Sequence, residues 1–275
     1  MMDASDIVTV IERDYIADLL KKGKRIDGRG LFDIRKVEMK TDFIPKAEGS
    51  ADVKLGDTRV ICGIKYDVGE PYPDSPDQGV ATCMTEFVPF ASPMFETGPP
   101  SIEAIEVARV VDRGIRHGNC IDNKKLCIKS GKQVYIIFID LYIMNYYGNL
   151  IDASAIAAIA ALVSAKIPGA KYDDEKETAV WDGKFQKLPL SELPVSITFG
   201  KINDTVFVDP SLPEDLCLDG RISYAIDESG NIASIQKSGI ATWDQEEVIR
   251  YSKIAVEKAN ELRSKLNLRQ YEPEL

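Results

Sequence analysis

The spacing of hydrophobic and polar positions alternates between helical and strand periods along the chain, which predicts a protein of mixed α and β structure. Residues 7–23 carry apolar side chains at helical spacing and end at Gly23, so we expect an amphipathic N-terminal helix. Four segments that follow have strand character: 32–43, 51–55, 59–66 and 81–90. Gly56-Asp57-Thr58 predicts a hairpin turn, and the proline-rich stretch 69–79 predicts an exposed loop.

The middle of the chain predicts a helix, a strand and a second helix in succession. Residues 101–117 begin at Ser101 and carry acidic residues early and arginines late, as both ends of a helix prefer. Residues 133–145 are apolar on both alternating faces, which predicts a central strand buried on both sides. Asp140 within this strand is expected to have a hydrogen-bonding partner. The alanine-rich segment 150–167 predicts a helix that neighbouring elements cover nearly all round.

The second half of the chain repeats this order of strands followed by a helix. Its predicted strands are 195–200, 205–209, 221–227 and 232–237. A final helix over 244–268 alternates acidic and basic residues on its outer face. The acidic segment 173–177 is expected to be a surface loop between the halves. Two strand clusters, each followed by a helix, indicate an α+β fold with an internal pseudo-repeat.

Composition narrows the classes of function. The 275 residues are 44% hydrophobic, enough for a core, and 34 basic against 44 acidic residues give a formal net charge of −10. Because phosphate neutralisation supplies most nucleic-acid affinity, the chain alone is a poor candidate for tight RNA or DNA binding. Five scattered cysteines and a single histidine, His117, argue against a zinc site or a disulfide framework. With neither a signal-peptide pattern nor a membrane-spanning apolar run, the protein is expected in the cytoplasm.

Positive charge is concentrated in residues 101–135, which hold seven basic and four acidic residues. Arg109, Arg113 and Arg116 fall at helical spacing and predict a stripe that suits a row of phosphates. The competing interpretation is a solvated face with local ion pairs, such as Glu106 with Arg109 and Asp112 with Arg116. A second basic cluster, in residues 21–29, is by composition only a surface loop.

Three segments resemble the RNase PH family of phosphorolytic ribonucleases: GKRIDGRG at 23–30, AEGSADVKLGDTRVICGIK at 47–65 and GPPSIEAIEVARVVDRGIR at 98–116. The YYGN turn at 146–149 and PEDLCLDGR at 213–221 extend the likeness over almost the whole chain. The resemblance implies an RNase PH-like fold of two pseudo-symmetric β-α-β-α halves, of the type of ribosomal protein S5 domain 2. It divides the chain into an N-terminal helix and basic loop (1–30), a first half (31–168) and a second half (169–275).

Within the family, the sequence is most similar to the non-catalytic subunit of the archaeal RNA exosome ring, because the positions of the active site have changed. Active members hold phosphate with a Gly-Ser-Arg run, whereas this chain has Gly148-Asn149-Leu150 and lacks the guanidinium. Active members place two metal-binding aspartates six residues apart, whereas here Asp215 is followed by Arg221. An adjacent arginine pair before the long helix is also missing. We therefore expect no catalysis and no metal or cofactor of its own.

The resemblance also implies partners. Arg109 and Arg113 match arginines that contact RNA beside a catalytic subunit, and Arg116 lies on the same stripe. Three heterodimers with that catalytic subunit, which would hold inorganic phosphate and a divalent metal, are expected to form a hexameric ring for 3′ to 5′ degradation of single-stranded RNA. Cap proteins with OB-fold and KH-type domains complete the expected complex, and the isolated chain should expose apolar and strand-edge surface. The alternative is a self-sufficient phosphorolytic 3′ to 5′ exoribonuclease.

Overall fold

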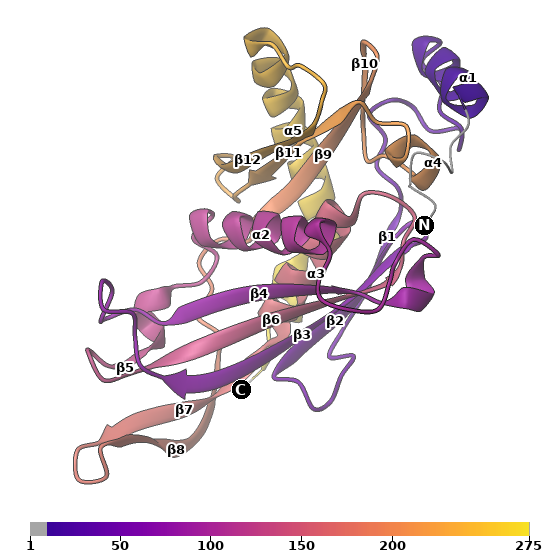
Figure 1. Ribbon diagram of the computed structural model, residues 1–275. Helices are drawn as coiled ribbons and strands as arrows, with labels where there is room; N and C mark the ends of the chain where they lie inside the picture. Colours follow the sequence, from indigo (N-terminus) through magenta and orange to yellow (C-terminus); the bar gives the residue numbers. More distant parts are fainter. Residues whose placement is uncertain (1–9, 275) are drawn as a thin grey trace.

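Two mainly antiparallel sheets, with helices between and beside them, and a separate two-stranded hairpin make up the computed structural model, which describes residues 10–274 (Figure 1). The beginning of the predicted N-terminal helix, residues 7–9, lies outside the described residues. The larger sheet comes from the first half of the sequence and the four-stranded sheet from the second. The predicted α+β fold with a repeated order of strands and helix is thus confirmed, and within residues 10–274 no helix is long and apolar enough to cross a membrane.

The larger sheet has the strand order β1-β2-β3-β6-β4, with a short β5 paired to β6. Its strands are β1 (Val37–Thr41), β2 (Gly49–Leu55), β3 (Thr58–Gly69), β4 (Val80–Phe87), β5 (Cys127–Lys129) and β6 (Gln133–Asn145). The predicted hairpin is present between β2 and β3, where Gly56 takes a left-handed φ of 57°. The strand expected over 32–43 is shorter and begins only at Val37.

The central strand β6 is buried on one face only, so the prediction of burial on both faces was wrong. Ile137, Ile139 and Leu141 are fully buried, whereas Tyr142 on the opposite face is 41% exposed. The helices cover one face of the sheet and leave the other open. Asp140 lies on the open face, half-buried, and has no hydrogen-bond partner among the described residues, contrary to the sequence expectation. Burial raises the pKa of this carboxyl group.

Two helices fill the space beside this sheet, α2 (Ile102–His117) and α3 (Leu150–Ser164). Ser101 caps α2, since its side chain accepts a hydrogen bond from the backbone N–H of Ala104. Every residue of α3 from Ile151 to Ser164 is buried, as the alanine-rich pattern predicts. Alanine on all sides lets both sheets approach this helix closely. α3 packs against β2 and β3 of the larger sheet and against β9 of the smaller one.

The smaller sheet has the order β10-β9-β11-β12, and all its pairs are antiparallel. Its elements are β9 (Val195–Ile202), β10 (Thr205–Val208), the short helix α4 (Leu212–Asp215), β11 (Gly220–Ile226), β12 (Ile232–Gly239) and the covering helix α5 (Gln245–Leu266). Asp244 caps α5 through a capping box with Glu247. These strands and the final helix agree with the sequence prediction to within a few residues.

A hairpin of β7 (Lys166–Asp173) and β8 (Thr178–Lys187) was missed by the sequence analysis. The acidic segment 173–177, predicted as a surface loop between the halves, is the exposed tip of this hairpin, which lies in the sequence between the strands of the two larger sheets. Almost every residue of β8 is exposed, so its sequence lacks the regular alternation of apolar and polar residues that predicts a strand. In Figure 1 the hairpin extends at the lower end of the molecule, away from α1.

The N-terminal helix α1 (Val10–Lys21) packs beside β10 and forms a small separate core there. Ile16 and Leu20 are buried against Phe207 and Cys217. The basic segment that follows is not only a surface loop, as its composition had indicated. Lys21, Lys22 and Lys24 are exposed, but Arg25 is 3% exposed.

Candidate functional site

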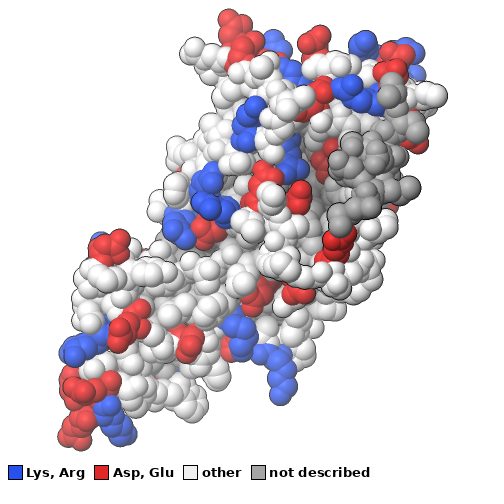
Figure 2. All heavy atoms as spheres, viewed as in Figure 1, with Lys and Arg blue, Asp and Glu red and all other residues white. Residues whose placement is uncertain are grey.

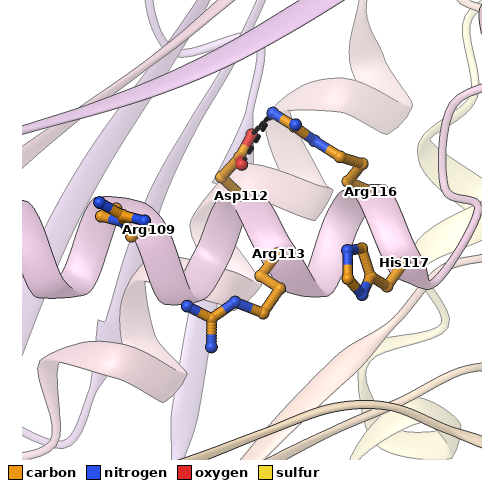
Figure 3. A pocket seen from close by; sticks show the side chains of 5 residues that line it. All are labelled: Arg109, Asp112, Arg113, Arg116 and His117. Carbon is orange, nitrogen blue, oxygen red and sulfur yellow. Dashed lines mark hydrogen bonds and ion pairs between the residues drawn. The ribbon is translucent and has the colours of Figure 1, made fainter.

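The arginines predicted to form a stripe line one hollow on the surface of α2. Arg109, Asp112, Arg113, Arg116 and His117 surround a space of about 180 Å³ (Figure 3). In Figure 2 basic side chains gather across the middle of the face that α2 crosses in Figure 1. The hollow is polar and open, which suits the backbone of a nucleic acid better than an apolar ligand.

The three arginines differ in how much of their charge is free. Arg116 donates two hydrogen bonds to the Asp112 carboxylate, at 2.9 and 3.1 Å, and so forms the predicted local ion pair. Arg113 donates to a neutral acceptor, the Oε1 atom of Gln236, at 2.8 Å. Arg109 is exposed and has no hydrogen bond or ion pair among the described residues. Figure 3 shows the Asp112–Arg116 pair on one side of the helix and Arg113 on the other.

The alternative pair of Glu106 with Arg109 does not form. Glu106 instead accepts a 2.6 Å hydrogen bond from Arg221 of β11. α2 therefore lies at the seam between the sheets, joined to β11 through Glu106 and to β12 through Arg113. The close fit of this seam depends on Gly114, where an added Cβ would lie 3.2 Å from that of Ala225. The position of the arginine hollow is set by this packing.

The predicted degenerate phosphate site, Gly148-Asn149-Leu150, forms the turn into α3. Gly148 has φ of 85°, and an added Cβ would lie 2.5 Å from the Pro210 carbonyl oxygen, so only glycine fits there. Asn149 caps α3 by accepting from the backbone N–H of Asp152. Leu150 is half-buried and offers no charge. The turn thus keeps the shape of a helix N-terminus without a cationic side chain of its own to hold an anion there.

Asp215 and Arg221, the predicted degenerate metal site, lie near enough to each other for their charges to interact. The Asp215 carboxylate accepts a 2.9 Å hydrogen bond from the Tyr146 hydroxyl. Burial raises the pKa of Asp215, and the nearby Arg221 guanidinium partly counters that effect. Although burial lowers it, the carboxylates of Asp215 and Glu106 raise the pKa of Arg221 overall.

This donor set does not fit a divalent cation. The one carboxylate at the position, Asp215, already faces a guanidinium, whose charge repels a metal ion. Within residues 10–274, no group of three or more histidine, cysteine or acidic side chains is placed to bind a metal. The five cysteines are free thiols, three of them buried.

A buried ionic cluster beside the turn was not found from the sequence. Asp209, fully buried, receives hydrogen bonds from Arg29 at 2.8 Å and from Arg35 at 2.8 and 2.9 Å. Although burial raises it, the hydrogen bond and charge of Arg35 lower the pKa of Asp209 overall. Asn149 links Asp209 to Asp152 by donating 2.8 Å hydrogen bonds to both.

The pKa of Asp152 is shifted upward, in the direction opposite to that of Asp209. Burial raises the pKa of Asp152 to about 7, although hydrogen bonds from Asn149 and Thr198 favour its ionised form. Arg35 also donates hydrogen bonds to the carbonyl oxygens of Tyr147 and Gly148, so the buried ionic cluster holds the turn at 146–149 in place. Arg35 thus reaches the degenerate phosphate site, but its guanidinium is paired with the Asp209 carboxylate.

Arg25 and Glu214 form a second buried ion pair, and both side chains are fully buried. Arg25 Nε donates to Glu214 at 2.9 Å, and the guanidinium also donates to the carbonyl oxygens of Val208 and Asp209. Its guanidinium carbon lies 5.0 Å from the centre of the Phe207 ring. The only sequence signal was the position of Arg25 inside the conspicuous GKRIDGRG segment, since its partner is 189 residues away.

The fold and these positions identify the class of protein. The chain belongs to the 3′ exoribonuclease family: domain 1 of that family matches residues 33–168 and domain 2 matches residues 192–258. It is 48% identical over 266 residues to the exosome complex component Rrp42 of Thermococcus kodakarensis, covering 96% of this chain and 97% of that protein. The Rrp42 protein of Thermoplasma acidophilum is 46% identical over 263 residues, covering 96% and 98%.

Solved structures agree with this assignment. A chain from the Archaeoglobus fulgidus exosome with RNA bound to the active site matches with a TM-score of 0.85 and 44% identity, over 93% of this chain and 97% of that one. A chain of an archaeal exosome core matches with a TM-score of 0.81 and 41% identity, over 93% and 96%. The RNase PH-like fold expected from the sequence is therefore confirmed.

Proposed function

We propose that this protein is a non-catalytic ring subunit of an archaeal RNA exosome in the cytoplasm. Relatives 46–49% identical to it are named as exosome components, and a chain of an exosome with bound RNA matches its fold. Its partner is a catalytic RNase PH-like subunit, and three such heterodimers form a hexameric ring with OB-fold and KH-type cap proteins. Single-stranded RNA is the substrate of the complex.

The observation that carries the non-catalytic assignment is that the guanidinium groups near the degenerate site, those of Arg221 and Arg35, are already paired with carboxylates. Phosphorolysis brings inorganic phosphate against a phosphodiester, so the site has to offset two negative groups with cations. Here Arg221 is held by Glu106 and faces Asp215, Leu150 is uncharged, and Arg35 is bound to Asp209. Phosphate and the divalent metal are therefore assigned to the catalytic partner.

The arginine hollow supports the second part of the proposal, which is contact with RNA. Arg109 and Arg113 have no carboxylate partner in the part of the chain that the structure describes, and both line the same hollow. The acidic net charge of the chain is compatible with this role, because a partner subunit contributes to the field of a shared channel. We assign a smaller part to Arg116, whose charge Asp112 neutralises.

Exposed apolar side chains support assembly with other subunits. They lie at the start of α2 (Ile102 and Ile105), on the open face of the larger sheet (Met84 and Tyr142) and on the β8 edge (Trp181 and Phe185). Exposed apolar surface on several faces is typical of a subunit that is covered by neighbours in its complex.

The test measures phosphorolysis directly. The purified chain, and the chain reconstituted with the catalytic RNase PH-like subunit of its source, are incubated with inorganic phosphate, Mg²⁺ and a single-stranded RNA. We expect nucleoside diphosphates from the reconstituted ring and none from the chain alone. Release by the isolated chain at the rate of an active homologue would overturn the assignment in favour of the self-sufficient exoribonuclease.

A further inference from the structure

Arg113 differs from its neighbours because a residue of the other sheet holds it. Its Nη1 atom donates to Gln236 Oε1 at 2.8 Å, across the seam between α2 and β12. Gln236 is placed by the pairing of β12 with β11, where it lies opposite Ser223. The contact joins residues 123 positions apart, so it depends on the packing of the two halves and not on the helix itself.

The orientation of the Gln236 amide follows from the chemistry of both groups. A guanidinium has donors only, so the atom that faces Arg113 has to be the amide oxygen. The amide nitrogen points the other way and donates a 3.4 Å hydrogen bond to the Lys237 carbonyl oxygen. Gln236 therefore restrains the guanidinium through one of its five N–H groups and leaves the others available to a phosphate.

A neutral partner has a different effect from an acidic one. A carboxylate at this position would hold Arg113 equally well but would cancel its charge, as Asp112 does for Arg116. An apolar residue would leave the charge but release the side chain, so RNA binding would have to order a free arginine. Glutamine at 236 satisfies both requirements.

We propose that Gln236 is a positioning residue for RNA binding, which holds the Arg113 guanidinium in place for a phosphate without neutralising it. The proposal rests on the proposed function, since it assumes that Arg113 meets RNA in the assembled ring. It adds a residue from the second half of the chain to a site otherwise built on α2. RNA affinity therefore depends on how the two halves are packed.

The test uses the reconstituted ring and a 5′-fluorescein-labelled oligoadenylate in phosphate-free buffer, where the RNA is bound but not degraded. Fluorescence anisotropy gives Kd over a series of salt concentrations for Gln236→Ala, Gln236→Glu, Arg113→Ala and the double variant Arg113→Ala/Gln236→Ala. Ser234→Ala, two residues earlier on β12, is the matched control. Size-exclusion chromatography checks that every variant ring is assembled.

We expect Gln236→Ala to raise Kd about threefold to tenfold, the value of one hydrogen bond, without changing the salt dependence. Gln236→Glu should also lower the slope of log Kd against log salt, by roughly 0.7, because one phosphate contact is lost. The double variant should bind as Arg113→Ala does, since Gln236 acts only through Arg113. Ser234→Ala should bind like the wild type.

Two results would overturn the positioning role alone. One is unchanged binding by Gln236→Ala while Arg113→Ala weakens binding, which leaves the RNA contact of Arg113 standing. The other is a further loss from Gln236→Ala in the Arg113→Ala background, which means that Gln236 acts by another route. Unchanged binding by Arg113→Ala itself would instead contradict this RNA contact of the proposed function, and the positioning role with it.

Discussion

Two arginine clusters that look alike in the sequence have opposite surroundings in the fold. The first cluster follows the N-terminal helix and consists of Arg25, Arg29 and Arg35. All three form ion pairs with buried carboxylates, Arg25 with Glu214 and the other two with Asp209. Arg109 and Arg113 lie on α2 and have no carboxylate partner among residues 10–274. Both clusters consist of a few basic residues within one short segment, and only the folded chain distinguishes them.

The difference shows that the number of arginines in a segment does not tell how many guanidinium groups are available to bind an anionic ligand. An arginine buried on a carboxylate has its charge cancelled and its donors occupied, so it holds the chain together. An exposed arginine on a helix costs the fold little and keeps its donors for a ligand. The comparison predicts that changes in the first cluster affect stability and changes in the second affect RNA binding.

The largest effect is expected at Arg25. Arg25→Ala should lower the free energy of unfolding by about 3–5 kcal/mol, because Glu214 would remain buried without its partner. Arg109→Ala, an exposed arginine in the other cluster, should change it by less than about 0.5 kcal/mol. Urea unfolding of the purified chains, followed by circular dichroism, measures both. Equal stability of the two variants would show that the clusters do not differ as described.

Two buried carboxylates linked by Asn149, Asp209 of the first cluster and Asp152 beside it, make stability depend on pH. Burial raises the folded-state pKa of Asp152 to about 7, above its unfolded value of 3.8. The contribution of this group is therefore fully present below pH 3.8 and is lost as the pH rises through about 7. Asp152→Asn should remove that decline, which amounts to at most about 1.4 kcal/mol per pH unit.

Urea midpoints between pH 4.5 and pH 8 measure the effect of Asp152→Asn. The variant should gain stability relative to the wild type as the pH rises. The pKa of Asp209 is lowered instead, so the contribution of that group to stability is lost as the pH falls below its unfolded pKa. A pH-independent difference between Asp152→Asn and the wild type would mean that Asp152 is ionised in the fold throughout this range.

The sequence predicted the elements of the fold better than the partners of its charges. Local signals suffice for a capped helix such as 102–117 or for the alanine-rich helix α3, since each depends on neighbours a few residues away. The pair of Arg25 with Glu214 joins residues 189 positions apart, and no local pattern contains that contact. The β7–β8 hairpin was missed for another reason. Most of β8 is exposed, and its apolar residues, among them Trp181 and Phe185, do not alternate with polar ones as in a half-buried strand.

In the candidate site, too, local spacing could be predicted from the sequence but the partners of the charged groups could not. The α2 spacing was sufficient to gather Arg109, Arg113 and Arg116 around one hollow. Which of them stays free was decided by Gln236 and Asp112, one from the second sheet and one from the same helix. The family resemblance identified Leu150 and Arg221 as changed active-site positions. Only the structure shows that Arg221 pairs with Glu106 and interacts with the charge of Asp215.

A smaller effect than that of the buried pair is expected from charge reversal on α2. Arg109→Glu/Arg113→Glu should weaken RNA binding and degradation by the reconstituted ring roughly tenfold to a hundredfold, since two charged contacts are lost. Size-exclusion chromatography should show an intact ring. Lys124→Glu/Lys125→Glu makes the same change in net charge outside the hollow and should have little effect. Loss of the ring in the first variant would identify these arginines as interface residues.

The smallest effect is expected from Asp112→Asn, which tests whether the Asp112 carboxylate limits RNA binding by the arginines of the second cluster. Asp112→Asn removes the charge that Arg116 now pairs with, so a third guanidinium becomes available beside Arg109 and Arg113. We expect the reconstituted ring to bind single-stranded RNA about twofold to threefold more tightly, with a steeper salt dependence.

Arg116→Ala in the Asp112→Asn background should abolish this gain. Asp122→Asn breaks a comparable pair, with Lys125, that does not line the hollow, and serves as the matched control. A gain from Asp122→Asn equal to that from Asp112→Asn would be a general effect of net charge. Unchanged affinity in Asp112→Asn would place Arg116 outside the path of the RNA. The functional part of the stripe would then consist of Arg109 and Arg113 alone, the two arginines of α2 that no carboxylate holds within residues 10–274.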